Sequence, residues 1–192
     1  GFIVYTDKHA LMTGDGTTTH LIAGSLAKWG YKYREGVGAE ARFDWITGFA
    51  QISEKLVVVA DHYNDCIRLI DRTTNNTSVF SGQCGKSSGY EDGRPGLFDY
   101  PWSVVIDKRD KTQLLITDTF NAAVRTVDVK SQAVGTFVKS ESLSGIIGIT
   151  QEEKSGDLYV TALHALYRIT YIQRTVSLIS GSTGSNSRGY RD

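Results

Sequence analysis

A polar phrase occurs twice in this chain, and the repeat constrains the fold more than any other feature of the sequence. The segment LVVVADHYNDCIRLID at 56–71 is matched by LLITDTFNAAVRTVD at 114–128. The polar residues that recur, 57 positions apart, are Asp61, Asn64, Arg68 and Asp71, matched by Asp118, Asn121, Arg125 and Asp128. Internal similarity at a fixed spacing is typical of solenoids and propellers. The sequence therefore predicts an architecture built from copies of one unit.

Each copy contains four apolar, strand-like runs that are separated by hairpin-length turns. The runs are 45–52, 56–60, 66–71 and 77–82 in one copy, 102–107, 114–118, 124–128 and 134–138 in the next, and 145–150, 157–161, 167–171 and 175–181 in the last. Short turns between such runs favour a four-stranded antiparallel meander. We therefore expect an all-β, single-domain β-propeller with blade two at 45–82, blade three at 101–138 and blade four at 145–181.

The two ends of the chain match parts of the same unit. Residues 1–25 align with blade four from its second strand onward, so we expect blade one there without its inner strand. Gly189-Tyr190-Arg191-Asp192 repeats Gly89-Tyr90-Glu91-Asp92, which predicts that 182–192 begins the next inter-blade loop. The chain then holds about 3.75 blades, and an unclosed ring leaves bare strand edges. We expect a fragment of a longer chain, or a chain that packs against another.

A closed four-bladed ring is the alternative. It would need the segment STGSNSRGYRD at 182–192 to supply the inner strand of blade one. That segment is rich in glycine and serine, which are poor strand formers, so the sequence disfavours this ring.

The recurrence of Asp61, Asn64 and Arg68 as Asp118, Asn121 and Arg125 indicates a structural role. We expect the aspartate to accept backbone N–H groups within its turn, the asparagine to bond locally, and the arginine to bridge to an acidic neighbour. Catalytic residues need to occur once, whereas scaffold residues recur. Phe43 and Phe98, which hold matching places in two inter-blade connections, are expected to be buried anchors.

These motifs resemble the NHL repeat. The resemblance rests on Gly-Tyr-Glu-Asp-Gly at 89–93, the approach at 98–101, Val-Val-Ile-Asp at 104–107 and the Asp118/Asn121/Arg125 phrase. It covers essentially the whole chain and implies a β-propeller, six-bladed in most members of the family. Blade four departs from the pattern, because Thr161 and His164 stand where the aspartate and asparagine are expected.

The only two cysteines, Cys66 and Cys84, belong to the same copy. Cys66 opens the third strand and Cys84 follows the fourth, which places them roughly opposite across one hairpin, close enough for a disulfide. Blade three has Ala123 in the first position and no cysteine near Ser140. Their joint presence favours a disulfide over two buried thiols, and with it an oxidising compartment.

Two overlapping N-glycosylation sequons, beginning at Asn75 and Asn76, fall on the expected outer hairpin turn of blade two. A glycan would be tolerated there, and together with the cysteine pair it favours a secreted protein or an ectodomain.

The loops between second and third strands and the inter-blade loops should emerge on one face, where recognition usually occurs. The residues expected on that face are Trp29, Tyr31, Tyr33, His62, Tyr63, Tyr90, Arg94 and Phe120. Aromatic residues and arginine dominate binding hot spots. The segment KWGYKYRE at 28–35 is the most site-like stretch, although its aromatics could instead pack on the blade below.

Three histidines, His9, His62 and His164, lie in or beside second-to-third loops of different blades. Such loops converge on a propeller axis, so a zinc site is conceivable. The phrase at 160–164 is similar to that of peptidyl-hydroxyglycine amidating lyase, a related propeller that holds zinc with histidines. The three histidines do not occupy equivalent positions, however, and we expect no metal and no cofactor.

Composition separates the remaining function classes. The chain carries 21 basic and 21 acidic residues, so its net charge is zero, which argues against a nucleic-acid ligand. The sequence has no apolar stretch of 18 residues to insert into a membrane. We expect, in this order, an extracellular non-enzymatic module that binds protein or glycan or assembles with other copies or chains, an enzyme of the amidating-lyase type, and an RNA-binding NHL domain.

Overall fold

The structure is a computed structural model that describes residues 3–26 and 33–182. In these ranges the chain forms β-strands joined by turns, and its helical segments are the 3-10 turns η1 (Gly38–Glu40), η2 (His62–Asn64) and η3 (Glu141–Leu143). None of the helices in these ranges has the length and apolar character needed to cross a membrane. The prediction of an all-β chain is therefore confirmed.

The strands form four antiparallel sheets in chain order. Blade one contains β1 (Ile3–Asp7), β2 (Ala10–Gly14) and β3 (Thr19–Gly24); blade two contains β5 (Ile46–Gln51), β6 (Leu56–Asp61), β7 (Cys66–Asp71) and β8 (Asn76–Gly82); blade three contains β9 (Pro101–Ile106), β10 (Gln113–Asp118), β11 (Ala123–Asp128) and β12 (Val134–Lys139); blade four contains β13 (Ile146–Gln151), β14 (Leu158–Ala162), β15 (Ala165–Ile169) and β16 (Val176–Gly181). Each strand of blades two to four begins and ends within two residues of the run expected from the sequence.

Blade two has a fifth strand that the sequence did not indicate. Strand β4 (Gly36–Val37) pairs with the outer strand β8 at Asn76 and Thr77. The connection into blade three does the same over a single residue, because Gly93 and Val134 exchange two backbone hydrogen bonds of 2.8 Å. In both blades the incoming connection therefore runs along the outer edge and covers part of it, which limits strand exposure.

The hydrophobic core lies between the blades. Ile22, Phe80 and Phe137 occupy equivalent places on the outer strands β3, β8 and β12. Each lies two residues before the outer-strand residue that pairs with the first residue of the neighbouring strand, which is β2, β7 or β11. Each is buried against the following blade, Phe80 among residues of blade three and Phe137 among residues of blade four. The blades thus stack face against face, as radially arranged sheets of a propeller do.

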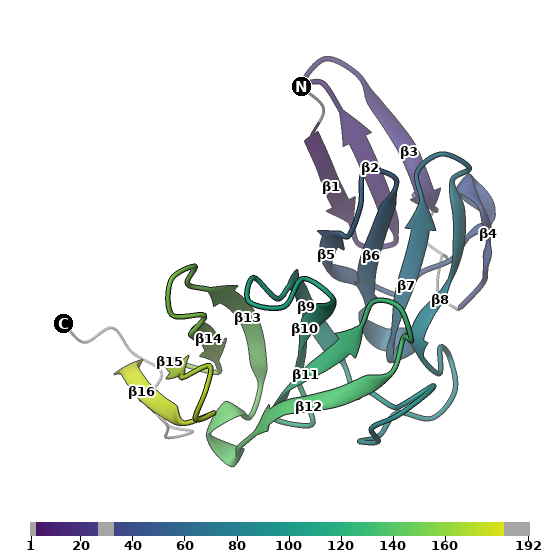
Figure 1. Cartoon of the computed structure of the whole chain (residues 1–192). Helices are drawn as coiled ribbons and strands as arrows, with labels where there is room; N and C mark the ends of the chain where they lie inside the picture. The colour runs from purple at the N-terminus through teal and green to yellow at the C-terminus, as the bar shows by residue number, and fades with distance from the viewer. Residues whose placement is uncertain (1–2, 27–32, 183–192) are drawn as a thin grey trace.

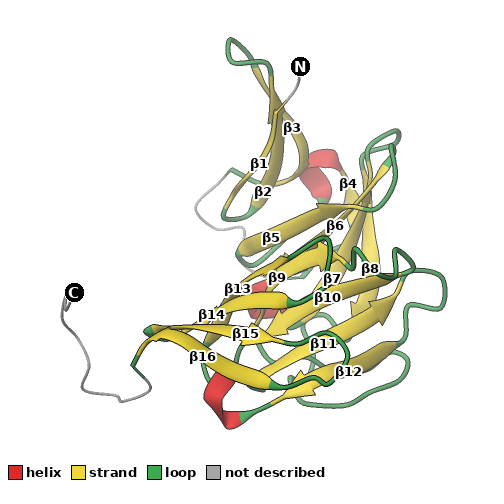
Figure 2. Ribbon diagram, turned by 60° about the vertical axis from the view of Figure 1, so that its left-hand side comes forward, coloured by secondary structure: helices red, strands yellow, loops and turns green. Residues whose placement is uncertain are grey.

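The four sheets follow one another around an arc, with blade one and blade four at its two ends (Figure 1). The inner strand β9 packs between β5 and β13, so blades two to four turn their first strands towards a common centre. Figure 2 shows the same sequence of sheets from another side. The architecture is that of a partial β-propeller of about four blades, as expected.

Among the described residues, strand β1 pairs with β2 alone. The inner strand of a complete blade would lie on the other side of β1. Residues 183–192, which include the repeated Gly-Tyr-Arg-Asp at 189–192, lie outside the described residues. The four-bladed alternative would need this segment for the inner strand of blade one. The number of blades in the intact ring stays a prediction.

Candidate ligand-binding surface

In blade two, the repeated phrase forms a buried clamp on the connection that enters the blade. Arg68 is fully buried, and its Nη1 lies 3.0 Å from Oδ2 of Asp61. The same guanidinium donates hydrogen bonds of 3.1 Å to the carbonyl groups of Arg34 and Arg42, in the connection. Asn64 donates its amide to Asp61 at 2.9 Å. The arginine therefore satisfies connection carbonyls that would otherwise be buried without a donor.

Blade three repeats the clamp. Arg125, again fully buried, pairs with Asp118 at 2.8 Å and donates to the carbonyl groups of Leu97 and Glu91 at 3.0 Å each. It also pairs with the carboxylate of Asp92 at 2.7 Å. Burial raises the pKa of Asp118 to about 6, while its hydrogen bonds and the charge of Arg125 act in the opposite direction. Because this pKa lies below 7, the carboxylate is ionised at neutral pH. In both blades the phrase holds the scaffold together.

One detail of the expected role is wrong. Asp61 and Asp118 accept backbone hydrogen bonds of 2.7 and 2.8 Å, but the donors are Asp44 and Asp99, which belong to the inter-blade connections and not to the turns. The turn after Asp61 closes through its own backbone, since Asp65 N–H donates to the His62 carbonyl. The carboxylate is therefore available to hold the incoming connection, and it fixes the residues that precede the first strand.

Blade four lacks the clamp, and its expected alignment needs correction. Thr161 and His164 do not take the places of the aspartate and asparagine, because the β14–β15 turn is two residues shorter than the β6–β7 loop. In the strand register, Ala162 stands where the aspartate stands in blades two and three, and Tyr167 stands where the arginine does. Tyr167 is buried in the core between blades three and four.

Four aromatic side chains, three of them exposed and one half-buried, form a continuous surface at the same end of blades two and three. We call Trp45, Tyr63, Tyr100 and Phe120 the aromatic surface. Successive ring centroids are 5.8, 5.4 and 4.4 Å apart, and the last pair is stacked. Trp45 is 38%, Tyr63 45% and Phe120 67% exposed. Aromatic groups of this kind on a rigid scaffold give a large apolar contact area at low entropic cost.

The histidine expected on this face lies beneath it. His62 is buried, and its ring contacts Tyr63, Tyr100 and Trp102 at centroid distances of 4.6, 4.9 and 4.7 Å. Its Nδ1 donates a hydrogen bond of 3.2 Å to the Pro101 carbonyl, and burial lowers its pKa. His62 therefore packs beneath the aromatic surface and is not accessible to a ligand.

Two members of the aromatic surface have an unfavourable backbone conformation. Trp45 and Tyr100 directly precede the first strands of their blades and have φ angles of 66° and 58°. The equivalent residue in blade four is Gly145, with a φ of 68°. Large L-residues rarely adopt positive φ, whereas glycine does so freely. Blades two and three thus keep bulky rings where the fold itself accepts glycine, which is typical of functional sites.

Three half-buried carboxylates accompany the rings. Asp44 and Asp99 accept the N–H groups of Tyr63 and Phe120 through their backbone carbonyls, at 3.0 and 3.2 Å. Asp65 accepts the Tyr100 N–H on its carboxylate at 2.8 Å. Burial raises the pKa of Asp65 to about 6, and the nearby carboxylates Asp99, Asp118 and Asp61 raise it further. The aromatic surface is therefore hydrogen-bonded to three acidic residues, through the backbone of Asp44 and Asp99 and through the carboxylate of Asp65.

The remaining residues expected on the binding face lie elsewhere. Tyr33 packs its ring on the Arg68 guanidinium, 4.8 Å from the centroid. Tyr90 lies between Arg125 and Lys139, and its hydroxyl hydrogen-bonds to Thr136 on the outer strand β12 at 2.7 Å. Arg94 donates to the side chain of Gln132 at 3.0 Å. Trp29 and Tyr31 lie outside the described residues.

The structure thus brings Tyr63 and Phe120 together, whereas Tyr33, Tyr90 and Arg94 contact the outer parts of their blades. Three further aromatic residues of this region, Trp45, Tyr100 and Trp102, were not predicted from the sequence. A signal for the first two was present, because both follow the same Phe-Asp pair at the end of a connection.

The three histidines do not form a metal site. His9 Nδ1 hydrogen-bonds to the Phe43 carbonyl at 3.0 Å, His62 is covered by aromatic rings, and His164 is exposed in blade four. In residues 3–26 and 33–182, no group of three histidine, cysteine or acidic side chains is placed to hold a metal ion.

The predicted disulfide is present. Cys66 and Cys84 are bonded, with their Cα atoms 5.0 Å apart, and Gly85 donates its N–H to the Asn64 carbonyl at 3.0 Å. The bond therefore holds the start of the next connection against the loop that carries Tyr63. The sequon residues Asn75 and Asn76 lie at the β7–β8 turn, where Asn76 is exposed. Their glycosylation stays a prediction.

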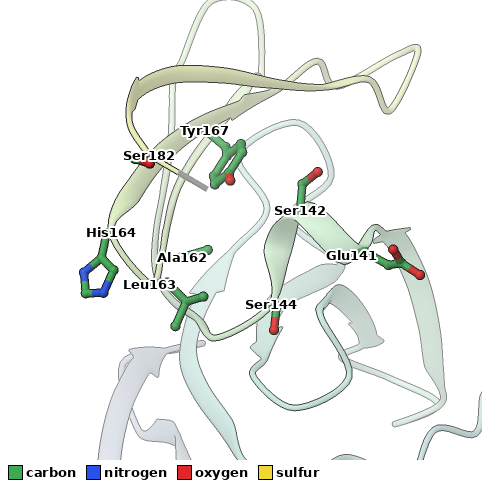
Figure 3. A pocket seen from close by; sticks show the side chains of 8 residues that line it. All are labelled: Glu141, Ser142, Ser144, Ala162, Leu163, His164, Tyr167 and Ser182. Carbon is green, nitrogen blue, oxygen red and sulfur yellow. The ribbon is translucent and has the colours of Figure 1, made fainter. Parts of the chain in front are cut away.

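A separate pocket of about 240 Å³ lies in blade four, beside the β14–β15 turn. It is lined by Glu141, Ser142, Ser144, Ala162, Leu163, His164, Tyr167 and Ser182 (Figure 3). His164 and Glu141 lie on opposite sides of this pocket in Figure 3. Its acidic and imidazole groups are therefore not arranged as a reacting pair.

Comparison with known proteins gives one curated relative and several structural neighbours. NHL repeat-containing protein 2 from Bos taurus is 26% identical over 141 residues, which cover 69% of this chain. The chain spans only 19% of the length of that relative. No protein-family model matches the chain.

Three solved structures share the fold at low sequence identity. A nidogen/laminin complex aligns with a TM-score of 0.67 and 11% identity, over 94% of this chain and 62% of the other. Virginiamycin B lyase from Staphylococcus aureus aligns with a TM-score of 0.57 and 12% identity, over 93% and 52%. An auxiliary nutrient binding protein from Bacteroides thetaiotaomicron aligns with a TM-score of 0.51 and 20% identity, over 69% and 33%. The chain is an NHL-like β-propeller.

Proposed function

We propose that this propeller is a non-enzymatic recognition module of a secreted protein or ectodomain, which binds a protein or glycan ligand at the aromatic surface. The proposal rests on the continuous row of aromatic side chains formed by Trp45, Tyr63, Tyr100 and Phe120. Two of them, Trp45 and Tyr100, have backbone conformations that suit glycine. Interfaces concentrate binding energy in such aromatic groups. A structural neighbour that was solved in a nidogen/laminin complex supports a protein ligand.

The extracellular part of the proposal rests on the disulfide and the exposed outer turn. The Cys66–Cys84 bond is buried, and such bonds persist in oxidising compartments. The exposed Asn76 belongs to a sequon on the outer turn. Expression behind a secretory leader in animal cells tests this part. We expect an oxidised cysteine pair and a glycan-dependent mass increase that disappears in Asn75→Gln/Asn76→Gln; a reduced pair in the secreted protein would contradict it.

An avidity screen tests the recognition role. The disulfide-intact chain, displayed as a tetramer, is applied to arrayed secreted proteins and glycans beside a Tyr63→Ala/Phe120→Ala variant. We expect a ligand whose signal falls at least about tenfold in that variant. The matched control is Leu163→Ala, because Leu163 is 66% exposed in the corresponding turn of blade four. A ligand that is lost with Leu163→Ala but retained with the double variant would contradict the proposal.

The enzyme and RNA alternatives stay predictions with direct tests. An amidating-lyase activity would require stoichiometric zinc, which metal analysis of the purified chain detects. An RNA ligand would show an affinity that falls steeply with salt concentration.

A further inference from the structure

The carboxylates beside the aromatic surface have no cationic partner. Five ion pairs occur in residues 3–26 and 33–182, and none of them includes Asp44, Asp65 or Asp99. Arg68 and Arg125 are fully buried and already paired in the clamps, and Arg42 donates its guanidinium to the carbonyl groups of Ala39 and Ala41. The aromatic surface is therefore accompanied by three carboxylates that form no ion pair within the described residues.

The chain itself shows which group such rings accept. Lys8 places its ammonium 5.6 Å from the centroid of Trp45, at one end of the aromatic surface. Elsewhere Lys139 lies 3.7 Å from the centroid of Tyr90. Cations are attracted to the negative faces of aromatic rings, and the attraction is stronger where water is displaced. Phe120 and Tyr63 are more exposed than Trp45, so their rings remain accessible to an incoming cation.

We propose that the aromatic surface recognises a cationic peptide segment, whose arginine or lysine side chains lie on Tyr63 and Phe120 and are balanced by Asp44, Asp65 and Asp99. This inference rests on the proposed function and names its ligand class. Charge complementarity decides between ligand classes. A neutral glycan would stack on the rings and donate hydroxyl groups to the carboxylates, but it would leave their negative charge uncompensated. An acidic glycan or RNA would be repelled. The segment is extended, because the rings lie in a row across two blades.

The test uses the full, disulfide-intact chain and two fluorescein-labelled octapeptides that alternate glycine with arginine or with citrulline. Citrulline keeps the shape of arginine but removes its charge. Binding is followed by fluorescence anisotropy at pH 7.5 in about 150 mM salt. We expect the arginine peptide to bind at least about tenfold more tightly than the citrulline peptide, because only the former supplies cations. Equal affinities would overturn the proposal.

Paired variants locate the effect. Asp99→Asn and Phe120→Ala should each weaken binding of the arginine peptide about fivefold. The matched controls are Glu54→Gln and Leu163→Ala. Glu54 lies in the β5–β6 turn, at the opposite end of blade two, and its loss removes the same charge. An equal loss in Glu54→Gln and Asp99→Asn would show a non-specific charge effect and overturn the proposal.

The two proposals fail differently. If the arrays yield a ligand that depends on Tyr63 and Phe120 but is a neutral glycan, or a protein whose binding is unaffected by Asp99→Asn, the cationic ligand class is wrong and the recognition role stands. If the arginine peptide binds with full affinity to Tyr63→Ala/Phe120→Ala, the aromatic surface is not its site, and the inference fails.

Discussion

Blades two and three differ from blade four at one position of the third strand, and the difference explains the polar phrase. Arg68 and Arg125 are buried there and bind the carbonyl groups of long incoming connections. Blade four has Tyr167 in that place. Its incoming connection is short, from Lys139 to Ile146, and buries Leu143 in the core instead. A buried arginine is therefore needed where a long, irregular connection brings carbonyl groups into the protein interior.

The same comparison separates scaffold from surface. The clamps fix Asp44 and Asp99, and the next residues, Trp45 and Tyr100, are held with positive φ as members of the aromatic surface. Blade four, without a clamp, has Gly145 at this point. The clamped connection and the aromatic ring at positive φ thus occur together in blades two and three, and both are missing from blade four.

The largest effect is expected from loss of a clamp arginine. Arg125→Met should lower the free energy of unfolding by about 3–5 kcal/mol, because it leaves Asp118 as a buried, uncompensated charge. At the equivalent position in blade four, Tyr167→Phe should cost less than about 1.5 kcal/mol, since only a hydroxyl is lost. Urea denaturation measures both. Similar losses in the two variants would mean that the clamp is not what stabilises blade three.

Loss of the disulfide should come next. Cys66 and Cys84 are 18 residues apart, and Cys66→Ala/Cys84→Ala should lower the free energy of unfolding by about 3 kcal/mol. Alanine is the matched residue, because blade three has Ala123 at the first position and folds there without the bond. Urea denaturation of the wild type with and without reductant provides the control. If the reductant leaves the midpoint unchanged, the bond does not contribute to the stability of blade two.

Asp65 gives a smaller, pH-dependent effect. Its folded-state pKa of about 6 lies above the ordinary value of 3.8, so the folded protein binds a proton more readily than the unfolded chain. Its contribution is therefore fully present below the unfolded-state pKa of 3.8 and is lost as the pH rises through 6. Solvent screening limits it to less than about 2 kcal/mol.

The pH effect is isolated by subtraction. Asp65→Asn keeps an acceptor for the Tyr100 N–H and suits the positive φ of residue 65. Its stability relative to the wild type should be greater at pH 7.5 than at pH 4.5. The carboxylates that face Asp65, namely Asp61, Asp99 and Asp118, are present in both proteins, so their direct contributions largely cancel. A stability difference that does not change with pH would contradict the raised pKa.

The smallest change in stability is expected at the aromatic surface. Tyr100→Gly should leave the free energy of unfolding within about 1 kcal/mol of the wild type, because relief of the left-handed conformation offsets lost ring contacts. Binding of the arginine peptide should fall. By contrast, Gly145→Ala should lose about 1 kcal/mol, since its φ is 68°, a backbone conformation that suits glycine and not alanine. A loss of about 3 kcal/mol in Tyr100→Gly would show that the ring is structural.

Much of the fold could be predicted from the sequence, because comparing the copies of a repeated unit shows where each strand begins and ends. The strand runs, the three strands of blade one within the described residues and the cysteine pair were all visible as matches or mismatches between copies. The fifth strand β4 was not, because a two-residue strand has no periodicity. The aspartate's true partners were also hidden, since they lie 17 and 19 residues upstream in irregular connections.

The candidate site was predicted only in part, for a physical reason. Tyr63 and Phe120 lie in loops that the meander places on one face, and they were found. Tyr33 and Tyr90 were expected beside them. Their rings instead pack on the guanidinium groups of the buried Arg68 and Arg125, in the outer parts of the blades. The turn in blade four is two residues shorter, which shifts its register and removes the match of Thr161 and His164 with the phrase.

The outer strand of blade four differs from those of blades two and three in its exposure. Ile179 occupies the place of Phe80 and Phe137 but is 47% exposed, whereas those residues are 4% and 6% exposed. In blades two and three this position packs on the following blade.

Hydrogen exchange with and without a bound ligand tests the assignment of recognition to blades two and three most directly. The disulfide-intact chain is compared free and saturated with a ligand, either the arginine octapeptide or a partner from the arrays. We expect slower exchange at residues 61–66, 99–103 and 118–123, and unchanged exchange at 161–165 in blade four. Slower exchange confined to 141–145 and 161–165 would place the ligand at the blade four pocket and contradict the account.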